Sequence, residues 1–209
     1  MSGTFPATPA PRSIRFGSIQ PTRISTSHSL KRYTRTLNAQ RWAMTLDFSQ
    51  LERDDLAPIW AFLVGQRGQY DTFQFVLPNP LYTPRGAGAI GSPSPSVNGN
   101  FGSPIATQTG RSIYTKQWQP STTILKAGDF LKFASHSKVY MAREDVASGS
   151  TGLALIPMEP AAVQELSDGD AIITSSVQFT VSLSQDGAGF GVQPGSILDL
   201  DTVELVEAL

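Results

Sequence analysis

The clearest pattern of hydrophobic and polar positions lies in residues 40–77. At its start, apolar side chains occupy every second position: Trp42, Met44, Leu46 and Phe48. This period of two is typical of a strand with one face against a core, because successive side chains of a strand point to opposite faces. Near its end, Phe73 and Phe75 open a second aromatic strand, which Pro78 and Pro80 stop. The block therefore predicts two half-buried strands.

Between these strands the spacing predicts one helix over about residues 50–66. Apolar residues recur at i, i+3, i+4 and i+7, namely Leu56, Ile59, Trp60 and Leu63. Ser49 and Glu52 match a capping box, in which each side chain bonds the backbone of the other residue. Pro58 lacks a backbone donor and crowds the preceding turn. We therefore expect the main helix to restart near Asp55, with Pro58 in its first turn.

The chain before this block gives weaker signals. Ile14 and Phe16 indicate a first strand that ends near Pro21. Residues 22–29 are polar and show no strong period, so no strand is predicted there. Residues 30–37 are expected to form a strand that leads into the block.

The chain after the block changes character. Residues 79–110 are rich in Gly, Ser and Pro and lack periodicity, which predicts a long flexible loop. Short, evenly spaced strands separated by turn signals follow in residues 111–175 and favour a small barrel or sandwich. Alternating apolar residues then predict a strand over residues 177–183 and a last strand over residues 197–206. The fold class expected from these patterns is mainly β with one helix.

Charge is unevenly distributed, although the net charge is only −1. Residues 1–46 contain seven Lys and Arg residues and no acidic residue, whereas residues 144–209 contain eleven acidic residues and no Lys or Arg. Either the two ends pair within one fold, or opposite charges face each other between subunits and guide their association. Nucleic-acid binding by the N-terminal arginines is a third interpretation.

Candidate chemistry is sparse. The chain has no cysteine, which excludes disulfides, thiolate zinc sites and cysteine nucleophiles. The run from Gly86 to Gly91 matches G-x-G-x-x-G, but its flanking prolines are incompatible with the strand and helix that a dinucleotide site requires. A zinc site would need both histidines, His28 and His136, together with a carboxylate. We expect no cofactor, no metal and no enzymatic activity, and no apolar run reaches the about 18–20 residues of a membrane span.

Aromatic residues are the remaining binding candidates. The periodic ones, Trp42, Trp60, Phe73 and Phe75, are expected in the core. Trp118 lies between Gln117 and Gln119 and is the candidate exposed aromatic residue for binding a sugar or peptide.

Two motifs carry a resemblance to a known family. The first is a strand, a capped helix with a central Trp and a Phe-Leu pair, and a Gly-x-Tyr-x-x-Phe-x-Phe strand. Its residues are Ser49, Glu52, Trp60, Phe62, Leu63, Gly68, Tyr70, Phe73 and Phe75. The second consists of residues 125–133, Lys138-Val-Tyr140 and residues 153–157. Together they resemble motifs of the distal tail and tail-tip (minor tail) proteins of siphophages, the long-tailed bacteriophages.

The resemblance implies a β-sandwich or barrel of the tail-tube type with one flanking helix, assembled as a ring of six. Such a ring would join the tail tube to the distal hub and fibres, and DNA would pass through its channel. Residues 1–80 and 176–209 would form the tube-like domain, and residues 81–175 an inserted barrel-like module. The implied partners are further copies of the chain, the tail-tube protein and the hub. The implied location is the virion tail, with assembly in the host cytoplasm.

The charge gradient takes a specific form under this resemblance. The candidate subunit-interface residues are Arg32, Arg35 and Arg41. The candidate lumen-facing residues, which would keep DNA from sticking, are Asp199, Asp201 and Glu204. An unrelated alternative for these carboxylates is a solvated strand face. The alternative function is a carbohydrate- or host-surface-binding β module that uses Trp118 and residues 81–110.

Overall fold

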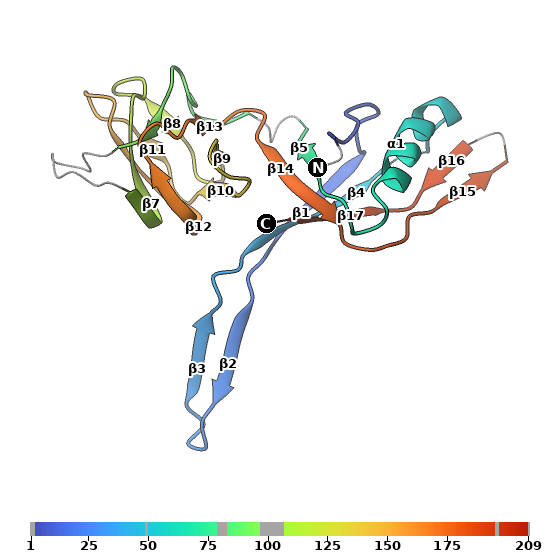
Figure 1. Cartoon of the computed structure of the whole chain (residues 1–209), viewed down its shortest axis with the longest axis horizontal. Helices are drawn as coiled ribbons and strands as arrows, with labels where there is room; N and C mark the ends of the chain where they lie inside the picture. The colour runs from blue at the N-terminus through green and yellow to red at the C-terminus, as the bar shows by residue number, and fades with distance from the viewer. Residues whose placement is uncertain (1–2, 49, 79–82, 97–106, 195–196, 209) are drawn as a thin grey trace. The chain divides into compact units, whose positions relative to one another are not determined.

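The computed structural model describes residues 3–48, 50–78, 83–96, 107–194 and 197–208. Contacts divide the chain into two compact units, Met1–Phe75 with Thr180–Leu209, and Val76–Phe179. Strands dominate both units, and the described residues contain one helix (Figure 1). The predicted fold class, mainly β with one helix and a barrel-like module, is confirmed.

The first unit is built on a five-stranded sheet in the order β1-β4-β17-β14-β5. The strands are β1 (Ser13–Ile19), β4 (Arg41–Asp47), β17 (Val203–Glu207), β14 (Gln178–Leu183) and β5 (Phe73–Val76). The first four pair antiparallel. Trp42, Met44 and Leu46 are buried as predicted, because β4 has neighbours on both edges and a core on one face.

Helix α1 spans Arg53–Gly65, and its apolar residues Leu56, Ile59 and Leu63 are buried. The capping-box prediction is wrong. Glu52 is itself the N-cap and makes no side-chain cap bond, and Ser49 lies outside the described residues. Pro58 is the sixth residue of one continuous helix, so the predicted restart near residue 55 is also wrong.

Two strands that follow β1 form a separate hairpin, β2 (Thr22–Thr26) and β3 (Arg32–Thr36). Sequence analysis missed β2. Every residue of both strands is exposed, and a strand without a buried face has no hydrophobic alternation to reveal it.

A second hairpin consists of β15 (Phe190–Gln193) and β16 (Ile197–Leu200). The sequence predicted one last strand, but the structure has two, β16 and β17. β16 is joined to the start of the helical segment by mutual backbone hydrogen bonds between Leu51 and Leu198, at 2.8 and 2.9 Å.

The second unit contains a six-stranded, nearly closed barrel-like sheet in the order β13-β9-β10-β12-β7-β6. Its strands are β13 (Ile172–Ile173), β9 (Phe130–Phe133), β10 (Val139–Ala142), β12 (Ala154–Ser167), β7 (Thr107–Lys116) and β6 (Ser94–Pro95). The two ends of the sheet approach each other, because the Ile172 amide donates to the Pro93 carbonyl at 2.9 Å. A pair, β8 (Thr123–Leu125) and β11 (Val146–Ala147), completes the unit.

The described part of the predicted loop 79–110 is largely tied to this barrel. β6 and the start of β7 fall within it, and the amides of Ala87 and Gly88 bond carbonyls of β8 at 2.9 and 2.8 Å. Gly86 lies so close that an added Cβ would be 2.4 Å from the Ile124 carbonyl oxygen. Gly86, the first glycine of the G-x-G-x-x-G run, therefore permits close backbone packing. Residues 79–82 and 97–106 lie outside the described residues.

Candidate assembly interface

The hairpin of β2 and β3, with the turn between them, is called the arm here (residues 22–36). Its strands pair with each other and with no other strand of the described chain. A two-stranded hairpin is marginally stable at best in water unless it packs against something. The exposed arm therefore gains little stability from packing within the described part of its own chain.

The arm is strongly basic. Its register places Arg23 opposite Arg35 and Thr26 opposite Arg32. Like charges directly opposite each other are destabilising, and no cation of the arm has an ion pair among the described residues. The charges of the arm therefore add nothing to the stability of the hairpin through ion pairs with the described residues.

The turn of the arm presents a leucine. The Ser27 amide donates to the Lys31 carbonyl, and the Leu30 amide donates to the Ser27 carbonyl, both at 2.9 Å. Leu30 has φ of 61° and is 84% exposed. Non-glycine residues adopt this left-handed conformation uncommonly, so the turn is a specific geometry that holds an apolar side chain in solvent.

The predicted interface arginines do not form one patch. Arg32 and Arg35 lie on opposite faces of β3, because they are three residues apart in a strand. Arg41 is the first residue of β4, opposite Ile19 of β1, and is also exposed. Arg41 therefore lies outside the arm, which carries Arg32 and Arg35.

Two of the three predicted lumen residues are brought together. Asp201 and Glu204 line a pocket of about 370 Å³ whose lining is both polar and apolar. The Glu204 carboxylate accepts hydrogen bonds from Ser184 Oγ and Gln185 Nε2, both at 2.9 Å. Asp199 is exposed on β16 and does not line this pocket.

An apolar groove lies between α1 and the β15–β16 hairpin. Its volume is about 260 Å³, and its lining residues are Arg53, Leu56, Ala57, Trp60, Phe190 and Leu198. The rings of Trp60 and Phe190 meet edge to face, with centroids 5.0 Å apart. Trp60 was predicted to be a core residue, but it is only half-buried at this groove. Sequence reasoning missed the groove, although alternating Phe190 and Val192 beside glycines was an available signal.

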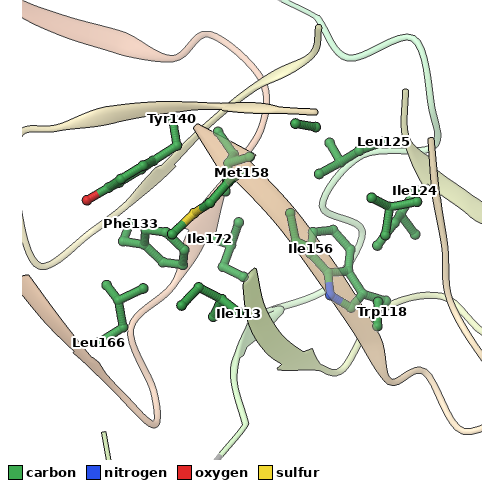
Figure 2. Close-up of a cluster of buried hydrophobic side chains, with 14 residues drawn as sticks. Ile113, Trp118, Ile124, Leu125, Phe133, Tyr140, Ile156, Met158, Leu166 and Ile172 are labelled. Carbon is green, nitrogen blue, oxygen red and sulfur yellow. The ribbon is translucent and has the colours of Figure 1, made fainter. Parts of the chain in front are cut away.

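Trp118 is not an exposed binding residue, and that prediction is wrong. It is 3% exposed and belongs to the buried hydrophobic cluster of the second unit, together with Ile113 and Ile156 (Figure 2). Its indole Nε1 donates to Thr115 Oγ1 at 2.7 Å, and Thr115 Oγ1 donates to the Ala154 carbonyl at 2.9 Å. The polar neighbours of Trp118 in sequence misled the prediction, because the tryptophan turns inward while Gln117 and Gln119 stay exposed.

The two histidines are in different units. His28 is exposed in the turn of the arm. His136 Nε2 lies 2.7 Å from the Tyr140 hydroxyl, which accepts a hydrogen bond from the Val163 amide at 3.1 Å. Burial lowers the pKa of His136, with Asp170 acting in the opposite direction and Lys132 adding to the decrease. This arrangement favours a neutral imidazole that shares a hydrogen bond with the Tyr140 hydroxyl.

The described residues include no group of three or more His, Cys, Asp or Glu side chains placed to hold a metal ion. None of the helices in the described part of the chain is long and apolar enough to cross a membrane. No family model matches the chain, and no curated protein matches it.

Proposed function

We propose that this chain is a structural subunit of a siphophage tail tip. Six copies form a ring that joins the tail tube to the distal hub and fibres, and DNA passes through the channel of the ring. The observation that carries this proposal is the arm, a basic hairpin whose strands are exposed at every residue.

The energetics of the arm support a role in assembly. A hairpin that buries little apolar surface gains little from the hydrophobic effect. Its Arg23–Arg35 register pair adds repulsion. Contact with a neighbouring copy removes both disadvantages, since it covers the arm and supplies carboxylates. The acidic C-terminal part of the same chain, residues 144–209, contains such carboxylates.

The two carboxylates that Asp201 and Glu204 place at one pocket support a second element of the proposal. We assign these carboxylates, with Asp199, to the channel wall, where negative charge repels the phosphates of passing DNA. A ring structure with Asp199, Asp201 and Glu204 on its outer surface would contradict this assignment.

Three observations test the proposed function. Light scattering and negative-stain electron microscopy of the purified chain are expected to show six-subunit rings with a central channel. An antibody against the chain is expected to label the distal end of phage tails, and the gene is expected between those of a tape-measure protein and a hub or fibre protein. Absence of the chain from the tails of virions would overturn the proposed function.

The carbohydrate-binding alternative loses its main residue. Its test depended on an exposed Trp118, and Trp118 is buried and hydrogen-bonded to Thr115. We therefore do not propose that function.

A further inference from the structure

We propose that the tip of the arm of one copy, with Leu30 at its centre, docks into the apolar groove of a second copy. The groove is the one between α1 and the β15–β16 hairpin. This inference rests on the proposed self-assembly and specifies the two surfaces that meet.

Leu30 is suited to be the inserted side chain. It is the most exposed large hydrophobic residue among the described residues, at 84%. The hydrogen bonds across the turn, from the Ser27 and Leu30 amides, hold its backbone at φ of 61°. The Lys31 amide also donates to Ser27 Oγ at 3.2 Å. A side chain fixed in this way loses little further backbone freedom on binding, which favours affinity.

The groove is suited to receive an aliphatic side chain. Apart from Arg53, its lining residues are all apolar. The apolar surface continues beyond it. Val64, four residues after Trp60 on the same face of α1, is 58% exposed, and Val192, two residues after Phe190 on the same face of β15, is 71% exposed. Such a continuous apolar surface marks a contact site.

The charges beside the two surfaces are complementary. Lys31 and Arg32 directly follow Leu30 in the arm, and no acidic residue lies near them in the sequence. The start of α1, next to the groove, carries three exposed carboxylates and one guanidinium, on Glu52, Asp54, Asp55 and Arg53. Complementary charge around an apolar centre fixes orientation and speeds association.

Leu30 is almost fully exposed in its own chain, so it does not fill the groove of that chain. The arm that occupies the groove therefore belongs to a second copy. The arm tip and the groove are different surfaces, so their contact is heterologous. Repeated head-to-tail, such a contact closes into a ring when the rotation permits. The docking thus provides the kind of contact that a ring of identical subunits requires.

The absence of cysteine makes a direct test possible. Leu30→Cys is made in one preparation of the full chain and Val64→Cys in another that carries a longer tag. When the two are mixed and mildly oxidised, a disulfide-linked heterodimer is expected. The matched control replaces Val64→Cys by Leu155→Cys, an exposed apolar position of the other unit. At least a tenfold lower yield is expected for this control.

A second measurement uses substitutions on the arm. Leu30→Asp is expected to raise the dissociation constant for self-association at least tenfold. Leu155→Asp, which changes a 44% exposed residue of the other unit rather than of the arm, is expected to change it less than threefold. The charge reversal Lys31→Glu with Arg32→Glu should weaken association, and Asp54→Lys with Asp55→Lys in the partner preparation should restore it.

The outcomes separate this inference from the proposed function. Rings without the heterodimer, or equal effects of Leu30→Asp and Leu155→Asp, would overturn the docking and leave the tail-tip proposal standing. A chain that stays monomeric at millimolar concentration and gives no heterodimer would also overturn the docking. A heterodimer from a chain that is absent from phage tails would support the docking and overturn the tail-tip function.

Discussion

Arg23 and Arg35 lie directly opposite each other on the paired strands β2 and β3 of the exposed arm. Adjacent guanidinium groups on one face of a hairpin repel each other. This arrangement costs the isolated hairpin stability, and the proposed contact with an acidic surface of a neighbour explains why it is useful.

The first prediction separates these two effects. Arg35→Glu converts the like-charge pair with Arg23 into an opposite-charge pair. Such a pair should stabilise the hairpin by about 0.2–1 kcal/mol. In the monomer, amide exchange in β2 and β3 should slow by up to about fivefold, whereas self-association should weaken. Arg12→Glu, an exposed change outside the arm, is the control. Faster exchange in the arm of the Arg35→Glu protein would contradict the prediction.

The second prediction concerns the buried tryptophan. Trp118→Ala removes a large core side chain of the second unit and should destabilise that unit by about 3–5 kcal/mol. Denaturant unfolding followed by far-UV circular dichroism measures the change. Gln119→Ala, at an exposed neighbour, should change stability by less than about 0.5 kcal/mol. A Trp118→Ala protein of unchanged stability would show that the tryptophan is not a core residue.

A third prediction tests the role of the G-x-G-x-x-G run. An alanine at Gly86 would place its Cβ 2.4 Å from the Ile124 carbonyl oxygen and 2.7 Å from the Leu125 nitrogen. Both contacts are to backbone, which cannot rotate away, so Gly86→Ala should cost about 1–3 kcal/mol or more. At Gly187 an added Cβ meets nothing within 4 Å, which makes Gly187→Ala the control. Differential scanning calorimetry measures the thermal stability of both variants, and only Gly86→Ala is expected to lower it.

The fourth prediction concerns pH. Burial lowers the pKa of His136, so the folded state favours the neutral imidazole more than the unfolded chain does. The resulting stability is fully present above the ordinary histidine pKa of about 6.5. It is lost as the pH falls from there through the lowered folded-state pKa.

Unfolding free energies measured between about pH 7.5 and 4.5 should therefore decrease less steeply in His136→Gln than in the wild-type protein. His28→Gln, at the exposed histidine of the arm, should keep the wild-type slope. If His136→Gln and His28→Gln have the same pH dependence, the lowered pKa does not contribute to stability.

The residues that sequence reasoning placed correctly share one property, a single buried face. β4 and α1 show periods of two and of 3.6 because one side of each meets a core, as Met44 and Ile59 do. β2 was missed because neither face is buried. Trp118 was misplaced because it lies in a polar loop, where no period exists to indicate which way a side chain turns. The groove at Trp60 and Phe190 joins residues 130 positions apart in the numbering. The alternation of Phe190 and Val192 indicates an apolar strand face, but it does not indicate that this face meets the helix.

The sequence by itself determined that this protein is mainly β with one helix, that its charge is divided between its ends, and which strands have an apolar face. These properties depend on neighbouring residues and can be read along the chain. The tertiary structure decided which strands pair. The C-terminal β17 lies between β4 and β14, and Glu207, fully buried, accepts a hydrogen bond from the Trp42 amide across 165 residues of chain. It also decided that the arm stays uncovered within its own chain, because burial depends on the whole set of long-range contacts and not on any single segment.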